Sequence, residues 1–132
     1  MLYLDSNVFI YAALNIEEIG ERARALLRKV QQGEEQACSS VLTFDELVWA
    51  VKKHRSVEDA IDAGEAFLNF PNMKLTVVDG ELLVLALNLI KKYKLDPRDS
   101  IHAATAILEK ADFIVSTDPH FDKIKETRRK LL

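Results

Sequence analysis

The chain has 132 residues, of which 48% are hydrophobic and 30% charged, as is usual for one globular domain. Its apolar runs are short, so we expect no membrane-spanning helix, and an N-terminus that turns acidic at Asp5 does not read as a signal peptide. The only cysteine, Cys38, excludes an internal disulfide and argues against a cysteine-ligated zinc site. We therefore expect a single domain over residues 1–132, located in the cytoplasm.

The net charge of −3 is unevenly distributed along the chain. Residues 1–90 carry a balance of −6, whereas residues 91–132 carry +3. If bound metal neutralised four carboxylates, the whole chain would reach +1. A phosphate-bearing partner is therefore tolerable, although composition alone does not favour one.

Short apolar runs alternate with segments of helical periodicity. In chain order, we expect strand 1–4, helices 6–14 and 17–32, strand 36–41, helices 44–53 and 56–70, strand 75–78, helices 80–93 and 97–110, strand 113–116 and a helical segment from Pro119. Gly33 should end the second helix in the left-handed conformation. The basic tail, residues 123–132, is expected to be helical or frayed. This alternation indicates a three-layer α/β/α fold around a parallel sheet of about four to five strands.

Four acidic residues lie where segments of the chain give way to helices: Asp5, Glu46, Asp99 and Asp118. The carboxyl ends of parallel strands meet at one edge of a sheet, so these side chains are expected in one pocket. Like charges that close repel by roughly 4 kcal/mol per pair at an effective dielectric near 20. A divalent cation would relieve that repulsion, and carboxylate oxygens suit Mg²⁺ or Mn²⁺. No glycine-rich phosphate loop or nucleophile elbow offers a competing chemistry.

Helix capping is the alternative explanation for each acid taken alone. Glu46, for example, follows Thr43 at the spacing of a capping box. Capping does not explain why polar triplets at residues 5–7 and 116–118 surround two of the acids. Asp79 also opens a helix but has no such neighbours, and it is interpreted as a plain cap.

Four segments together resemble the motifs of PIN domains, most closely those of VapC-type toxins from type II toxin–antitoxin operons. They are Leu-Asp-Ser-Asn-Val at residues 4–8, Leu-Thr-Phe-Asp-Glu-Leu at 42–47, Asp-Pro-Arg-Asp-Ser-Ile-His-Ala-Ala-Thr-Ala at 96–106, and Phe-Ile-Val-Ser-Thr-Asp-Pro-His-Phe-Asp at 113–122. The match spans nearly the whole chain in the family's order. It implies a metal-dependent endoribonuclease that hydrolyses RNA phosphodiesters with Mg²⁺ or Mn²⁺.

The resemblance also assigns roles to single residues. It implies that the catalytic, metal-binding acids are Asp5, Glu46, Asp99 and Asp118. Asn7 and Thr117 would support them through hydrogen bonds, and Asp122 matches a less regular outer acidic position. Asp45 replaces Glu46 if the motif register slips by one. Candidate RNA contacts are Arg98, Lys52 and Lys53, for which ordinary solvated charge is the alternative.

Two further expectations concern His102 and partners. His102 is interpreted as an orienting or packing residue rather than a metal ligand. Relatives commonly form homodimers and are neutralised by a small antitoxin that lies in a groove near the active site. Trp49 is interpreted as core, unless its exposure shows that it belongs to an interface.

Two other functions remain open from the residues. An acidic pocket with Mg²⁺ also describes a receiver-like phosphoacceptor module, but a receiver opens with paired acids and Asp5 stands alone. A receiver also needs a lysine near its last strand, where this chain has Pro119 and His120. The third reading is a catalytically silent PIN-like module that only binds RNA.

Overall fold

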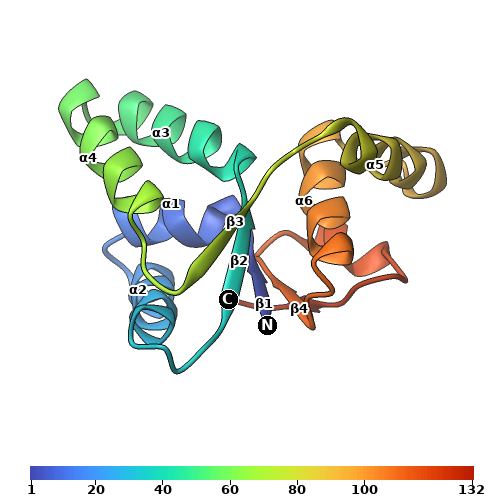
Figure 1. Cartoon of the computed structure of the whole chain (residues 1–132). Coiled ribbons are helices and arrows are strands. Elements are labelled where there is room, and N and C mark those ends of the chain that lie inside the picture. The colour runs from blue at the N-terminus through green and yellow to red at the C-terminus, as the bar shows by residue number, and fades with distance from the viewer.

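The computed structural model describes residues 1–132 and is built around a five-stranded parallel sheet in the order β3-β2-β1-β4-β5 (Figure 1). The strands are β1 (Leu2–Leu4), β2 (Ala37–Ser40), β3 (Met73–Thr76), β4 (Phe113–Val115) and β5 (Arg129–Lys130). The helices are α1 (Ser6–Leu14), α2 (Glu18–Gln31), α3 (Leu42–His54), α4 (Val57–Leu68), α5 (Gly80–Tyr93), α6 (Pro97–Leu108) and the 3₁₀ turn η1 (Pro119–Lys123). The predicted parallel α/β fold is confirmed.

Helices cover both faces of the sheet and give it three layers (Figure 1). Successive side chains of a strand point to opposite faces. Leu2 and Leu4 accordingly pack into a core with α1 to α4, whereas Tyr3 packs into a second core with α5 and α6. None of the helices combines the length and hydropathy that crossing a membrane requires.

Local sequence signals account for several element ends. Gly33 adopts φ +78°, as predicted for a left-handed residue just after α2. Ser56 caps α4 by accepting a hydrogen bond from the Asp59 N–H at 3.0 Å. Asp79 caps α5 in the same way through the Leu82 N–H at 2.9 Å, which agrees with its interpretation as a plain cap.

Two predicted segments differ in the structure. The third strand begins and ends two residues earlier than predicted, because residues 73–76 pair with β2 from Ala37↔Met73 to Ser40↔Thr76. The prediction of a helical or frayed tail was wrong, because Arg129 and Lys130 add β5 to the free edge of β4. A strand of two residues is too short to show the alternating pattern by which strands are recognised in a sequence. β5 forms because β4 has an unpaired edge beside it.

The topology determines where the acids lie. β1 lies between β2 and β4, and the chain leaves each of these strands at the same edge of the sheet. Asp5 directly follows β1, α3 starts two residues after β2, and Thr117 and Asp118 follow β4. Residues more than 100 positions apart therefore meet at this edge.

Ile114 provides a test of the second core. It is fully buried in the middle of β4, so Ile114→Ala should lower the free energy of unfolding by about 2–5 kcal/mol, and Ile114→Val by about 0.5–1.5 kcal/mol. Urea titration followed by circular dichroism measures both values. A cost below about 1 kcal/mol for the alanine variant would contradict the assigned packing.

Candidate active site

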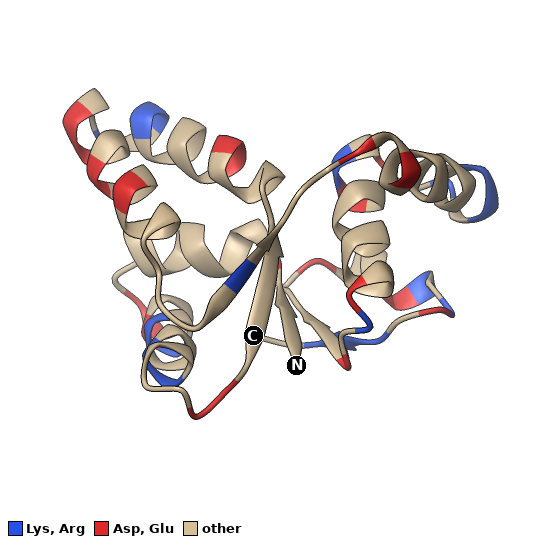
Figure 2. Cartoon of the chain, in the orientation of Figure 1, with Lys and Arg blue, Asp and Glu red and all other residues tan.

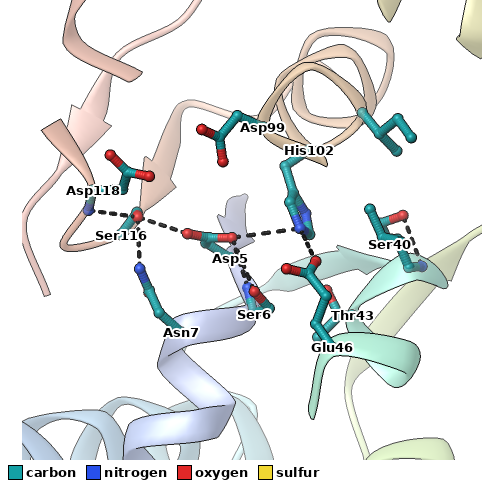
Figure 3. Close-up of polar contacts among 12 residues, drawn as sticks. Asp5, Ser6, Asn7, Ser40, Thr43, Glu46, Asp99, His102, Ser116 and Asp118 are labelled. Carbon is teal, nitrogen blue, oxygen red and sulfur yellow. Dashed lines mark hydrogen bonds and ion pairs between the residues drawn. The ribbon is translucent and has the colours of Figure 1, made fainter. Parts of the chain in front are cut away.

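Asp5 is the most buried acid of the site, with 5% of its surface exposed. Its Oδ1 accepts the Ser6 N–H at 2.8 Å, so it caps α1 as the capping alternative supposed. Its Oδ2 accepts the Ser116 hydroxyl at 2.7 Å, a contact across 111 residues of sequence that capping does not require. Asp5 therefore both begins a helix and lies at the centre of a polar network (Figure 3).

Ser116 joins the two central strands of the sheet through its hydroxyl. The hydroxyl donates to Asp5 and accepts the Asn7 Nδ2–H and the Asp118 N–H, both at 2.9 Å. Asn7 also donates to the Thr117 hydroxyl at 3.1 Å. The expected hydrogen-bonding roles of Asn7 and Thr117 thus have matching contacts, but Ser116 holds the carboxylate directly.

Glu46 lies in the second turn of α3 and points toward Asp5 (Figure 3). The capping box suggested by its spacing from Thr43 does not form, because the Thr43 hydroxyl instead contacts the Ser39 hydroxyl at 2.8 Å. The Glu46 Oε1 lies 2.5 Å from Nε2 of His102, a residue that is 1% exposed. His102 Nε2 is also 3.6 Å from the Asp5 Oδ1, so this ring links the two carboxylates.

Asp99 and Asp118 approach the site from α6 and from the turn after β4. His120 connects them, since its Nδ1 lies 3.4 Å from the Asp99 Oδ2 and 3.3 Å from the Asp118 Oδ1. Asp96 contributes a third ligand-type oxygen, and ligand atoms of Asp96, Asp99 and His120 all lie within 4.8 Å of one another. Asp96 stands at the N-cap position of α6 without making a side-chain capping bond.

The electrostatics show the cost of gathering these acids. Burial raises the pKa of Asp5, although His102 and the Ser116 hydroxyl oppose the shift. Burial and the neighbouring Asp118 charge raise the pKa of Asp99. The pKa of Glu46 is lowered, because the hydrogen bond and charge of His102 outweigh the opposing effect of burial.

The pKa of His102 shifts in the opposite direction to that of Glu46. Burial alone would lower the pKa of His102, but the carboxylates of Glu46 and Asp5 outweigh burial and raise it. The ring is thus the principal cationic partner for the inner pair of acids. Asp99 and Asp118 both lie beside the exposed His120, and the charges of His102 and Arg129 reach Asp99 and Asp118, respectively.

A hard divalent cation fits this donor set. The acids gathered here offer carboxylate oxygens and no thiolate, and the one group whose ligand atoms lie within 4.8 Å of one another is Asp96, Asp99 and His120, without Asp5 or Glu46. Burial in the first place raises the pKa of both Asp5 and Asp99, so their charged forms carry a penalty. A cation between them would remove that penalty. Oxygen ligands with two histidines at the margin favour Mg²⁺ or Mn²⁺ over zinc.

The remaining candidates lie at or beyond the margin of the pocket. Asp45 is exposed, whereas Glu46 contacts His102. This contact favours Glu46 over Asp45 as the acid of the second motif. Asp122 is bonded to Arg129 at 2.7 and 2.8 Å, and it reaches the site only through the Arg129 contact to the Ser116 carbonyl at 3.3 Å.

The three basic candidates differ in their distance from the acids. Arg98 precedes Asp99 and is near enough to lower the pKa of Glu46. Lys52 and Lys53 lie in the last turn of α3, about 10 Å along the helix from Glu46 at 1.5 Å per residue. Lys53 also lies over the Trp49 ring, 4.8 Å from its centroid.

Sequence reasoning did not assign the roles of Ser116, Tyr3 and His120. Ser116 belonged to a triplet that was recognised as unusual, and only the geometry separates it from Thr117. Tyr3 lay in the predicted strand 1–4 without a role of its own, and its contact with His102 joins positions 99 residues apart. His120 had a signal in the motif that follows Asp118, but no role followed from it.

The fold defines an α/β protein that gathers carboxylates at one edge of a parallel sheet. The PIN domain family matches residues 2–127, and the chain belongs to that family.

Similar proteins agree with this assignment. Ribonuclease VapC2 of Methanocaldococcus jannaschii is 24% identical, in an alignment covering 93% of this chain and 88% of that protein. VapBC2 from Rickettsia felis, solved bound to a promoter DNA fragment, superposes with a TM-score of 0.77 at 18% identity, covering 99% of this chain and 98% of that one. VapC20 of Mycobacterium tuberculosis, described as a sarcin-ricin loop cleaving toxin, gives 0.75 at 11% identity, covering 97% and 99%. These solved structures support the fold.

Asp99→Asn should stabilise the metal-free protein. Because the pKa of Asp99 is raised, the folded state binds its proton more tightly than the unfolded chain, and stability falls as pH rises through that pKa. At pH 8 in EDTA, we expect the variant to melt above wild type, by roughly 4 °C for each kcal/mol of cost relieved in a domain of this size. The difference should be smaller at pH 4 than at pH 8, because more of the wild-type carboxyl is protonated at the lower pH.

Asp79→Asn is the matched control for this measurement. It makes the same substitution at a helix-opening residue outside the pocket, and asparagine caps helices as well as aspartate does. Its melting temperature should follow that of wild type at both pH values. A destabilised Asp99→Asn at pH 8 would show that the Asp99 carboxylate is already compensated without metal.

Proposed function

We propose that this protein is a metal-dependent endoribonuclease, the toxin of a toxin–antitoxin pair. The observation that carries the proposal is the convergence of four carboxylates from four segments at one edge of the sheet (Figure 3). The PIN family match and the likeness to ribonuclease VapC2 support RNA as the substrate. No finding favours a receiver-like phosphoacceptor or a silent RNA-binding module.

Asp5 and Asp99 are the proposed holders of one Mg²⁺ or Mn²⁺, with Glu46 and Asp118 acting directly or through water. An ion held there would make a water easier to deprotonate and would offset charge on the attacked phosphate. Ser116 keeps the Asp5 carboxylate aimed into the pocket, and Asn7 holds Ser116 in place. Attack of water on the phosphodiester leaves a 5′-phosphate and a 3′-hydroxyl.

The substrate must approach a pocket that is itself acidic. Arg98 is the basic residue best placed to contact an RNA phosphate, because it lies beside Asp99 at the start of α6. Lys52 and Lys53 are proposed to contact more distant phosphates of a longer RNA. Residues 1–132 act as one unit in this scheme, in the cytoplasm where RNA is available.

A groove between α1, α2 and α4 is the proposed antitoxin site. All nine residues that line it are apolar, among them Phe9, Leu27, Ala63, Phe67 and Phe70. The α3–α4 hairpin beside it exposes further large apolar side chains, Trp49 (59% exposed), Val57 and Ile61. The exposure of Trp49 reverses its interpretation as core and favours an interface.

The charge of α4 indicates what this partner would carry. Its exposed face holds four acids, red in Figure 2: Glu58, Asp59, Asp62 and Glu65. A partner with an apolar stripe flanked by lysines or arginines would match both features. Coexpression with a small protein encoded beside this gene would provide the partner.

A second apolar surface on α5 is the proposed homodimer interface. Leu83, Val84 and Leu87 lie on one face of this helix and are 46%, 63% and 51% exposed. Surface of this kind is costly to leave in water, and a second copy of the chain would cover it. It is separate from the groove, which lies on the opposite side of the sheet (Figure 1).

Cleavage of an end-labelled RNA pool tests the activity. Partner-free wild type should cut RNA in Mg²⁺ or Mn²⁺ and stop in EDTA. Asp5→Asn and Asp99→Asn should each lower the rate by about 100-fold or more, because each removes a carboxylate proposed to hold the ion. Asp79→Asn should cleave like wild type. Unchanged cleavage by Asp99→Asn, or full activity in EDTA, would refute the proposed mechanism.

Light scattering after size exclusion tests the dimer. Wild type should elute as a dimer at micromolar concentration, and Leu87→Glu should weaken association by about 30-fold, since a charge placed in an apolar interface costs about 2 kcal/mol or more. Trp49→Glu, on the α3–α4 hairpin, should remain dimeric. A Leu87→Glu variant as dimeric as wild type would exclude α5 as the interface.

A further inference from the structure

Three buried groups form a hydrogen-bonded chain that ends on Glu46. The Tyr3 hydroxyl lies 2.6 Å from Nδ1 of His102, and Nε2 of the same ring lies 2.5 Å from the Glu46 Oε1. Tyr3 is completely buried and His102 is 1% exposed. The two rings also make an edge-to-face contact, with centroids 5.9 Å apart.

The hydrogen-bonding capacities of these groups give the chain a direction. The Tyr3 oxygen accepts the Ser40 N–H at 3.2 Å, which leaves its own hydrogen free to be donated to Nδ1 of His102. A neutral ring that accepts at Nδ1 carries its hydrogen on Nε2; a protonated ring also carries a hydrogen on Nε2 and donates its Nδ1–H to the Tyr3 oxygen instead. In both states the Nε2 hydrogen faces Glu46, so His102 donates to the carboxylate.

The chain connects elements on opposite faces of the sheet. Tyr3 and α6 belong to the core with α5, whereas α3, which carries Glu46, packs into the core with α1, α2 and α4. His102 extends across the sheet edge between them, and its Nε2 lies 3.6 Å from the Asp5 Oδ1 (Figure 3). Besides this bridge, the Ser6 side chain also interacts with the Glu46 carboxylate, but His102 has the largest effect of any neighbouring side chain on it.

We propose that His102, oriented by Tyr3, is a positioning residue that fixes the Glu46 carboxylate in the geometry needed to bind the divalent cation. The inference rests on the proposed metal-dependent function and adds to it a residue pair outside the acidic set. Hydrogen-bond partners behind metal ligands typically contribute 10- to 100-fold to metal affinity, because they remove the freedom of the ligand to turn away.

If His102 only packed in the core, an apolar residue would be expected at this position. Its neighbours on the same helix, Ala103, Ala104 and Ala106, are all fully buried and apolar. A buried imidazole among them is costly to desolvate unless both ring nitrogens are bonded, and here both are. A leucine of similar size would preserve the packing but not the contact to Glu46, so the two roles are separable.

Mn²⁺ affinity is the readout, measured by calorimetry on the full-length protein without RNA. His102→Leu should weaken Mn²⁺ binding by about 10-fold or more, whereas His102→Gln, which retains a donor near the Nε2 position, should stay within about 3-fold of wild type. Tyr3→Phe removes only the hydroxyl that orients the ring and should weaken binding by about 3-fold or more. Circular dichroism and thermal melting establish that each variant is folded, and Tyr3→Phe provides the test if His102→Leu fails to fold.

A double-mutant cycle with Glu46→Gln tests whether His102 acts through Glu46. In the Glu46→Gln background, His102→Leu should weaken Mn²⁺ binding by no more than about 2-fold, because the contact is already lost. Wild-type affinity in folded His102→Leu, or an equal loss in both backgrounds, would overturn the proposal. If wild type itself does not bind Mn²⁺, both the proposed function and this inference fail. If wild type binds Mn²⁺ but the variants bind equally well, only this inference fails.

Discussion

The cost of burying carboxylates together at one edge of the sheet is the constraint on which this structure depends. Asp5 is 5% exposed and Asp99 lies beside Asp118, and burial with like charge raises the pKa of both Asp5 and Asp99. Acids whose pKa is shifted by burial and neighbouring charge cluster at functional sites, because such shifts cost folding stability. The surrounding hydrogen bonds reduce this cost without removing it, which leaves a place for a cation.

The rest of the fold serves to hold the acids close despite this cost. β1 occupies the centre of the sheet, so Asp5 has the turn after β4 on one side and the start of α3 on the other. Ser116 bonds Asp5 to the first of these, and His102 bonds Glu46 on the second. The two cores fix the elements from both faces, and the C-terminal strand β5 closes the edge of β4 next to the site.

The sequence was sufficient for the layers, the parallel sheet and the shared location of the four acids at one sheet edge, because apolar runs, helix periodicity and helix-opening acids are local signals. It was insufficient where a contact joins distant residues with no local signal. Ser116 and Thr117 are adjacent hydroxyls, and only the strand pairing shows which one reaches Asp5. β5 exists because β4 offers a free edge, and the bond of Tyr3 to His102 requires α6 to lie over β1. Trp49 read as core from its spacing, yet it is 59% exposed, because helix periodicity does not reveal whether a partner covers the apolar face.

The most direct test of the shared cation site is a crystal of the protein soaked in Mn²⁺, with anomalous diffraction recorded to locate the ion. We predict an anomalous peak inside the pocket, in contact with carboxylate oxygens of Asp5 and Asp99, and loss of that peak in Asp99→Asn. A pocket without a peak in well-diffracting crystals at millimolar Mn²⁺, or an ion bound only at the outer Asp96 and His120 side, would contradict the account.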